Sequence, residues 1–566
     1  MLRSALTAKT GTAEVNLGHW NSYISALDDR SSTHGFQRPL PCHLGGFPDP
    51  RAGRHAIDAG VAAGIAINVT LPQWTGFGGV APIIIHDAAS GETKSISGLG
   101  RWPKAASIDF FNQNCGGELP PGVLRTVTPS AADAWITALK LYGTMSFEQV
   151  VTPALELAEG GFPIPATLQS ALARTGDSLI GDSDGDGRWP STAEVFFPGG
   201  RRPDIGDILV QKDLARTFHR LIEVERDHAG QGREAALQAA RDFFYKGEIA
   251  EEIVRFVQSE GGLLTMEDMA EFGVGIDTPP SIDYKGIEVF ACGPWCQGPM
   301  NLHTLKILEG FDLRGLGHNT AAYAHTVIEV LKLAFSDREA YYGDPDFVDV
   351  PIAGLLSNSY AEERRGAIDR SRAAPEMPLA GDPWPHQGMP ARNGHPARPD
   401  LVAGGLPADT SYASVSWLDP QHPSALVPGK RPRLTPNPAL AMRNGKPLMP
   451  FGTPGGDVQP QSMVQLFLNV VEFGMDVQQA VEAPRFSTWS FPNSFWPHAY
   501  HPGLVGVEGR MDSNVVSELS RLGHKVEVWD DFTPRMGCLC AVQVDQQRGG
   551  LSGGADPRRD GYAMGR

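Results

Sequence analysis

One threonine in the C-terminal third of the chain is placed where nucleophilic chemistry could arise. Thr410 follows Asp409 at the end of a proline- and glycine-rich stretch, and it precedes a strand that we expect at Tyr412–Trp417. If the backbone breaks before Thr410, the new α-amino group can take the proton of the same residue's hydroxyl. Such an amino group titrates at a pKa of about 7.7–8.0, close to working pH. These residues predict a self-cleaving amide hydrolase or acyl-transfer enzyme.

Two glycines further along supply a second part of that chemistry. Gly455 and Gly456 end the stretch that begins at Pro450, and an apolar helix, expected at Gln461–Phe473, follows. Glycine leaves the backbone N–H groups unencumbered, and a helix N-terminus favours negative charge, so this turn could stabilise an oxyanion. The alternative interpretation is an ordinary strand-to-helix turn, for which glycine is the usual residue.

Bulk properties limit the classes of function. The chain has 566 residues, 41% of them hydrophobic, and a net charge of −17, which disfavours binding to nucleic acid or anionic membranes. No apolar run reaches the ~20 residues that span a bilayer. The start, Met1–Lys9, lacks the apolar region of a signal peptide, so we expect a cytoplasmic location. The six cysteines lack zinc-site spacing and predict reduced thiols; no cofactor or metal is expected.

Hydrophobic periodicity predicts a mixture of helices and strands in a layered α/β or α+β core. We expect helices at 56–68, 131–141, 147–159, 212–225, 234–244, 250–259, from 320 onward, 461–473 and 477–483. We expect strands at 82–86, 287–292, 412–417, 447–451, 525–529 and 538–544. Residues 176–200 read as a polar insert, and a long segment rich in Pro, Gly and Ala ends at residue 408 and reads as a linker.

The ordered set of motifs resembles the gamma-glutamyltranspeptidase family of N-terminal-nucleophile hydrolases over about residues 55–566. The motifs that carry the resemblance are His55–Ala59, Gly76–Gly79, Pro129–Trp135, Ala154–Pro163, Tyr341–Pro345, Asp409–Tyr412, Gly429–Pro432, Thr453–Gly456, Ala483–Phe486 and Gly554–Arg559.

The resemblance implies an α+β fold, a four-layer αββα sandwich, made as one precursor. It implies cleavage between Asp409 and Thr410 into a large subunit, 1–409, and a small catalytic subunit, 410–566. The large subunit would comprise a folded core, 55–371, and a flexible linker, 372–409. Thr410 would attack γ-glutamyl amides such as glutathione, and water, an amino acid or a peptide would accept the glutamyl group.

The resemblance also implies roles for individual residues. Gly455 and Gly456 match the oxyanion-hole glycines, and Arg101 matches the arginine that binds the α-carboxylate of the substrate. Thr435, with Leu434, stands where the family has a serine pair that helps to bind this carboxylate. A guanidinium suits the task because its planar fork can hold a carboxylate with two hydrogen bonds.

The chain departs from the family pattern in several places. After Val415–Trp417 it continues at once with Leu418-Asp419-Pro420, and about two strands of typical length are missing, together with the groups that grip the substrate α-amino group. An inner deletion from a mispredicted exon boundary is one hypothesis, and transcript reads that confirm the junction as written would refute it. His55 replaces an asparagine, and Tyr412 replaces the common histidine.

Alternative functions stay open at this point. One is a related amidase or acylase with another acyl specificity, and another is an uncleaved, inactive relative. Two further motifs are weaker: Asp182–Gly187 resembles the start of a calcium loop but lacks the acid at position twelve, and Gly550–Gly554 fits a serine-hydrolase elbow but Asp556-Pro557 follows in place of a helix.

Overall fold

The structure is a computed structural model that describes residues 56–180, 190–392, 415–559 and 561. Its contacts divide the chain into two compact units. The first unit comprises 1–77, 135–241 and 559–566, and the second comprises 78–134 and 242–558. In the described part of the chain, no helix combines the length and the apolar character needed to cross a bilayer.

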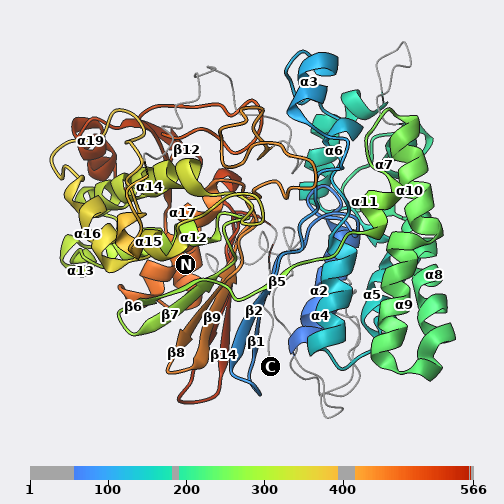
Figure 1. The fold of residues 1–566 in the computed structure, drawn as a ribbon. Helices are drawn as coiled ribbons and strands as arrows, with labels where there is room; N and C mark the ends of the chain where they lie inside the picture. The colour runs from blue at the N-terminus through green and yellow to red at the C-terminus, as the bar shows by residue number, and fades with distance from the viewer. Residues whose placement is uncertain (1–55, 181–189, 393–414, 560, 562–566) are drawn as a thin grey trace, which may run out of the picture. The chain divides into compact units, whose positions relative to one another are not determined.

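The first unit is mainly helical, with α2, α5 and α8 packed side by side (Figure 1). Its elements are α2 (Ala56–Thr70), α5 (Phe147–Gly160), β3 (Phe162–Pro163), α6 (Ala166–Ile180), α7 (Pro190–Phe196), η4 (Pro198–Gly200), β4 (Ile208–Leu209), α8 (Lys212–His228) and η5 (Ala229–Gln231). The helices α4 (Ala131–Tyr142) and α9 (Arg233–Lys246) each contain a boundary between the units.

The buried Asp58 explains one of the motifs in the first unit. Its carboxylate accepts hydrogen bonds from the Thr144 N–H at 2.8 Å, the Thr144 hydroxyl at 2.6 Å and the Met145 N–H at 3.1 Å. These bonds fix the turn before α5, so Asp58 has a structural role here.

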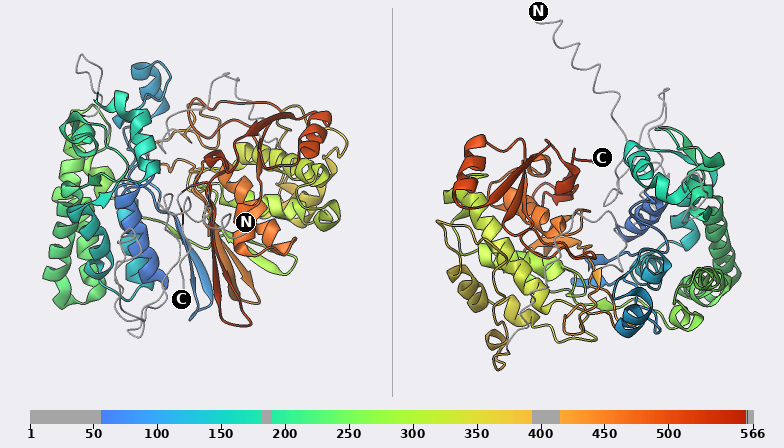
Figure 2. Two further views of the ribbon diagram at one scale, coloured as in Figure 1. Left: turned by 180° about the vertical axis from the view of Figure 1, so that it is seen from behind. Right: turned by 90° about the horizontal axis from the view of Figure 1, so that it is seen from above.

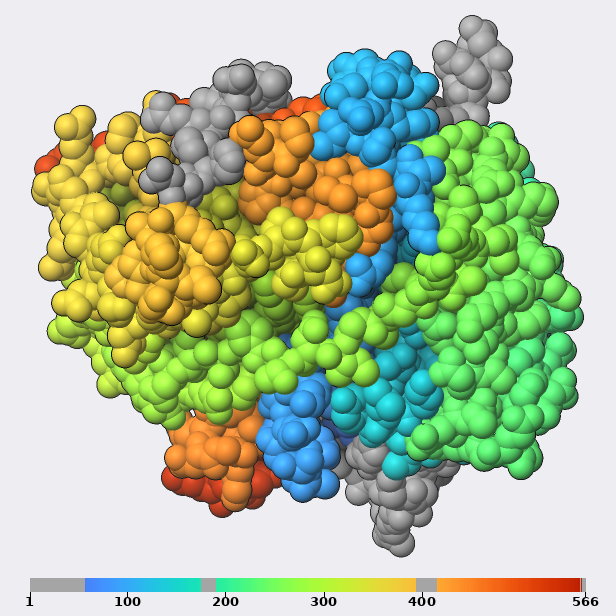
Figure 3. Space-filling model, viewed as in Figure 1, coloured from blue at the N-terminus to red at the C-terminus, as the bar shows by residue number. Residues whose placement is uncertain are grey.

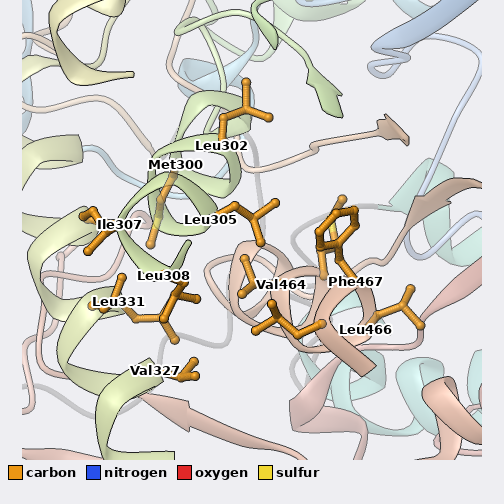
Figure 4. Packing of buried hydrophobic residues seen from close by; sticks show 14 of the residues in the cluster. Met300, Leu302, Leu305, Ile307, Leu308, Val327, Leu331, Val464, Leu466 and Phe467 are labelled. Atoms are coloured by element: carbon orange, nitrogen blue, oxygen red, sulfur yellow. The ribbon is translucent and has the colours of Figure 1, made fainter. Parts of the chain in front are cut away.

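The second unit is built on a six-stranded antiparallel sheet in the order β14-β13-β9-β8-β7-β6. Its strands are β6 (Ser281–Tyr284), β7 (Ile287–Ala291), β8 (Ala439–Arg443), β9 (Lys446–Gly452), β13 (Cys540–Val544) and β14 (Leu551–Ala555). The helices α12 (Gly298–Leu308), α14 (Ala321–Tyr341) and α17 (Val458–Val471) lie on one side of this sheet (Figure 1). Figure 4 shows how their apolar side chains interdigitate, among them Leu305, Leu331 and Phe467.

A three-stranded sheet, β1-β2-β5, lies next to the larger one (Figures 1 and 2). Its strands are β1 (Ile83–Asp87), β2 (Glu92–Ile96) and β5 (Ile276–Asp277), and among the described residues β1 pairs with β2 alone. Side chains between the sheets form a buried cluster, which we call the site cluster: Leu99, Cys292, Trp295, Cys296, Val415, Leu434 and Phe495, with Val80 and Ile84 packed against it. The second unit therefore stacks a helical layer and two sheets.

The remaining elements of the second unit surround these layers. A third sheet has the order β10-β11-β12, with β10 (Phe486–Thr488), β11 (Leu504–Glu508) and β12 (Lys525–Trp529). The other helices and turns are α3 (Ile108–Cys115), η3 (Val123–Arg125), α10 (Glu248–Ser259), α11 (Met266–Ala270), α13 (Leu313–Leu316), α15 (Ile352–Leu355), α16 (Asn358–Gly366), η6 (Pro385–Gln387), α18 (Val477–Glu482), α19 (Ser513–Arg521) and η8 (Pro534–Met536).

Most elements expected from the sequence are present, and two expectations were wrong in part. The polar insert at 176–200 contains the end of α6 and all of α7. Within the expected strand 412–417, the described residues form no strand: Trp417 makes a single bridge to Ala425. Its ring stacks on that of His498, with centroids 3.8 Å apart. No disulfide joins the five described cysteines to one another.

Candidate active site

The glycine turn, Gly455–Gly456, precedes α17 in a conformation that other residues rarely adopt. Gly455 has φ 138° and Gly456 has φ 62°, and a Cβ on Gly455 would lie 2.5 Å from Val458 Cγ1. Their carbonyls accept from the N–H groups of Val458 and Gln459 at 3.3 and 3.2 Å. Within the described ranges, nothing accepts from the N–H groups of the two glycines, and Gly455 is exposed. The turn therefore offers two backbone donors to an incoming acceptor.

The Gln297 side chain fixes the glycine turn through a hydrogen bond. Its Nε2 donates to the carbonyl of Gly456 at 2.9 Å and to that of Thr435 at 3.1 Å, and it is buried. Its Oε1 accepts from Arg338 Nη1 at 2.9 Å. One amide thus connects two of the positions singled out in the sequence, and its own place is fixed by an arginine on α14.

A buried group of charges lies behind this amide. Arg338 donates to Asp457 Oδ1 at 2.5 Å and to Glu339 Oε1 at 2.7 Å, and Arg433 donates to Glu339 Oε1 at 3.1 Å. Burial alone would raise the pKa of Glu339, but Arg338 and Arg433 hold it well below its usual range. Asp457 also accepts from the Ser494 N–H at 2.7 Å, so the residue after the glycine turn is anchored on two sides.

Arg101 lies in the glycine loop after β2, and the loop is held by close backbone approaches. The Ser130 hydroxyl is 2.9 Å from the carbonyl oxygens of both Gly79 and Gly98, and a Cβ on Gly100 would lie 2.1 Å from the Thr128 carbonyl oxygen. Arg101 Nη1 donates to the Gly429 carbonyl at 3.1 Å, and the side chain is partly exposed. The glycines of this loop are required by packing rather than by a nucleotide phosphate.

Two aspartates beside Arg101 carry charges to which the sequence analysis gave no role. Asp346 Oδ2 accepts from Arg101 Nη2 at 2.9 Å. The buried Asp344 accepts from the Arg431 N–H at 2.9 Å and from Arg431 Nη2 at 2.5 Å. Asp344 belongs to the quoted motif Tyr341–Pro345, and this motif was the signal that could have found the pair.

Thr410 and Asp409 lie outside the described residues, and so does the first half of the expected strand 412–417. The chain is described again from Val415, which is fully buried in the site cluster with Leu99, Leu434 and Phe495. Leu99 is two residues before Arg101, Leu434 is next to Thr435, and the Phe495 ring faces Gly456. In addition, the Ser416 hydroxyl accepts from Trp102 Nε1 at 2.9 Å. The four sequence segments thus meet in one buried cluster.

Leu426 packs with Trp102 and with Phe111 of α3 in a second buried cluster. Figure 3 shows the corresponding orange surface of the chain after residue 415 next to the light blue of α3. Residues 372–392, the described part of the expected linker, contain only η6 and pack against the fold through the buried Ala373 and Trp384.

One group of described side chains has the donor atoms for a metal: His325, Glu329 and His524, whose ligand atoms lie within 4.8 Å of one another. Lys332 Nζ already donates to Glu329 Oε1 at 2.7 Å, and His325 Nδ1 is 2.9 Å from His524 Nε2. Because an ammonium already neutralises the only carboxylate, we assign no metal to this group.

The two weaker motifs gain no chemistry from the structure. Gly550–Gly554 lies largely within β14, where Ser552 is in register with Gln543 of β13, so it forms no strand-to-helix elbow. The motif that resembles a calcium loop, Asp182–Gly187, lies outside the described residues.

Comparisons with known proteins agree with the family resemblance seen in the sequence motifs. The sequence pattern of the family described as gamma-glutamyltranspeptidase matches residues 51–416 and 402–566. The glutathione hydrolase-like YwrD proenzyme of Bacillus subtilis (strain 168) is 32% identical, over 91% of this chain and 94% of its own length. A glutathione hydrolase proenzyme of the same strain is 30% identical, over 91% of this chain and 88% of its own length.

A solved structure gives the same result for the fold. The structure of a cephalosporin acylase from Bacillus halodurans matches with a TM-score of 0.77 and 28% identity, and the match covers 96% of this chain and 99% of that one. The expected α+β fold of the N-terminal-nucleophile hydrolases is therefore confirmed. The chain belongs to the gamma-glutamyltranspeptidase family of hydrolases and transferases, which includes related acylases of the same fold.

Proposed function

We propose that this chain cleaves itself before Thr410 and then hydrolyses or transfers γ-glutamyl groups through an ester on the Thr410 hydroxyl. The observation that carries the proposal is the site cluster. It brings Val415, five residues after Thr410, together with the neighbours of Arg101 and Thr435 and with the ring against Gly456. Relatives named glutathione hydrolase proenzymes support the substrate class and the maturation.

The chemistry follows from the groups around this cluster. The freed α-amino group of Thr410 takes the hydroxyl proton while the oxygen attacks the γ-carbonyl carbon. The N–H groups of Gly455 and Gly456 donate to the resulting oxyanion. The leaving amine departs with the proton, and water or the amino group of an amino acid or peptide then attacks the ester and releases the glutamyl group.

Cleavage would divide the chain into subunits of 1–409 and 410–566, which stay associated. In this arrangement Arg101 holds the α-carboxylate of the donor, with Thr435 beside it. Thr435 is well placed for a fixed role because its carbonyl is bonded to Gln297. The large subunit thus contributes Arg101 to substrate binding, and the small subunit contributes Thr435, the nucleophile and the oxyanion donors.

The test is the mass of the purified protein. The wild-type chain should give two fragments on a denaturing gel, and the smaller one should begin with Thr410. Thr410→Ala should give one uncut chain without activity, because both cleavage and turnover need the hydroxyl. A wild-type chain that stays intact, from a verified reading frame, would contradict the proposal and favour an uncleaved relative.

A second candidate function is an acylase with another acyl group. Leu434, where the family has a serine, is buried in the site cluster and offers no hydroxyl to a carboxylate. The structural match to a protein named cephalosporin acylase is consistent with this alternative. Hydrolysis of γ-glutamyl anilide compared with glutaryl anilide separates the two candidates.

A further inference from the structure

Arg101 and Asp346 form an ion pair that is exposed to solvent. The Arg101 side chain is 32% exposed and the Asp346 side chain 52%, with Nη2 and Oδ2 2.9 Å apart. A guanidinium has five N–H donors, and across the described residues only two of those of Arg101 have hydrogen-bond acceptors, Asp346 and the Gly429 carbonyl. Arg101 can therefore bind a second carboxylate without releasing Asp346.

Asp346 keeps its negative charge and has an oxygen to spare. The hydrogen bond from Arg101 lowers the pKa of Asp346 below its usual range. The side-chain contacts of Asp346 within the described ranges all involve Oδ2, which also lies 3.2 Å from Arg431 Nη2. Oδ1 is thus free to accept from a ligand.

The charged side chains next to this pair, Asp344, Lys430 and Arg431, already have hydrogen-bond partners within the protein. Asp344 is buried and takes both the N–H and the guanidinium of Arg431, and Lys430 Nζ donates to the Pro423 carbonyl at 2.7 Å. The two arginines and the two aspartates, 344 and 346, sum to zero charge. A ligand with only a carboxylate gains little net attraction from these four side chains, because their charges sum to zero. A ligand with both a carboxylate and an ammonium can pair each charge with the opposite one, on Arg101 and Asp346.

We propose that Asp346 binds the α-ammonium group of the acyl donor, next to an α-carboxylate on Arg101. The inference rests on the proposed function and adds a specificity residue to it. In a γ-glutamyl group the ammonium and the carboxylate are attached to the same carbon. When the α-carboxylate of the substrate binds the free N–H groups of Arg101, the neighbouring ammonium is therefore brought close to the Asp346 carboxylate, which is bound to the same guanidinium.

A glutaryl group is the appropriate probe, because it differs from γ-glutamyl only in lacking the ammonium. The ratio of kcat/KM for γ-glutamyl anilide to that for glutaryl anilide then isolates this group. We expect Asp346→Asn to lower the ratio about 10- to 100-fold, the effect of one hydrogen bond to a charged group. Asp346→Glu, which keeps the charge, should recover part of the ratio.

Asp349→Asn is the matched control. Asp349 is three residues further along and pairs with an exposed arginine, Arg392, at 3.2 Å. The substitution removes the same charge from the same loop, and we expect the ratio to stay within about twofold of the wild type. Thermal melts monitored by circular dichroism show that each variant is folded.

Two results would overturn the inference. An unchanged ratio of the two kcat/KM values in Asp346→Asn would show that Asp346 does not bind the ammonium. An increase in kcat/KM for both substrates would show that Asp346 only competes with the substrate carboxylate for Arg101. If the wild type neither cleaves itself nor turns over either anilide, the proposed function fails separately. Calorimetry with L-glutamate and glutarate then decides: Asp346→Asn must weaken L-glutamate binding about tenfold or more and leave glutarate unchanged.

Discussion

At the scale of single residues, Gln297 is the side chain that connects Thr435, the proposed substrate-binding residue, to the proposed oxyanion turn. Its amide donates to the carbonyls of Thr435 and Gly456, and its oxygen accepts from Arg338. The Gly456 carbonyl shares its peptide plane with the N–H of Asp457, so the hydrogen bond from Gln297 fixes the end of the glycine turn that leads into α17. Gln297 therefore acts as a positioning residue for the glycine turn.

We expect Gln297→Ala to lower kcat more than it changes KM, and to cost about 1–3 kcal/mol of unfolding free energy, because it removes the side-chain donor to the Thr435 carbonyl and one of the two donors to the Gly456 carbonyl. Steady-state kinetics and urea unfolding measure the two effects. Gln546→Ala is the control, since the Gln546 amide also donates to backbone carbonyls, at 3.0–3.2 Å, but in the distant β8–β9 hairpin. Equal losses of kcat in both variants would argue against a positioning role.

At the scale of elements, α14 and α17 do most to build the site. From Tyr323 to Tyr341 every residue of α14 is buried, so this part of the helix is covered on all sides. Some of its polar side chains pair within the helix, as Lys332 does with Glu329. Others pair with neighbouring segments, as Arg338 does with the Asp457 carboxylate at the start of α17. The glycine turn is the joint between β9 and α17, and its geometry depends on φ values that favour glycine.

We expect Gly455→Ala to lower kcat about 10²- to 10³-fold, as the loss of one oxyanion donor does, because the new Cβ would collide with Val458 and shift the turn. The Gly445→Ala variant is its counterpart, as Gly445 also has a positive φ, 68°, but open space around it in the β8–β9 turn. It should cost about 1–3 kcal/mol in stability and leave kcat unchanged. Kinetics on both proteins, with a melt for each, provides the comparison.

At the scale of the whole molecule, buried neutral histidines make the fold sensitive to acid. Burial lowers the pKa of His303 and of His524 to about 3, and that of His498 to about 4. An unfolded chain takes up these protons near an ordinary pKa of about 6.5. Between about pH 6.5 and pH 4 the unfolded state thus binds more protons, so stability is present above this window and is lost as the pH falls through it.

His498 lets this effect be measured at one position. We expect the unfolding free energy of the wild type to fall from pH 7 to pH 4.5, and His498→Gln to reduce that fall by about 2–3 kcal/mol. Urea titrations at both pH values provide the numbers. His219→Gln, which changes a histidine with 48% side-chain exposure, should keep the full pH dependence. A His498→Gln slope equal to that of the wild type would contradict the assignment.

Much of the local structure was predictable because its signals are local. Ser146 caps α5, Thr320 caps α14 and Asp476 caps α18, as their positions before apolar-periodic runs indicate. The strand β8 was missed, since Ala439–Arg443 carries little of the β-branched and aromatic character that marks strands. Family motifs in the correct order led to the proposed nucleophile and the proposed oxyanion turn.

The sequence by itself determined which residues could react: a threonine at a cleavable junction, two glycines before a helix, and an arginine in a glycine loop. The tertiary structure decided what stands beside them, namely Asp346 at Arg101 and Gln297 under the glycine turn. Gln297 and Gly456 are 159 residues apart, and Trp102 and Ser416 are 314 apart. Periodicity and capping act within a few turns of chain, whereas such pairings arise only when distant segments pack in one core.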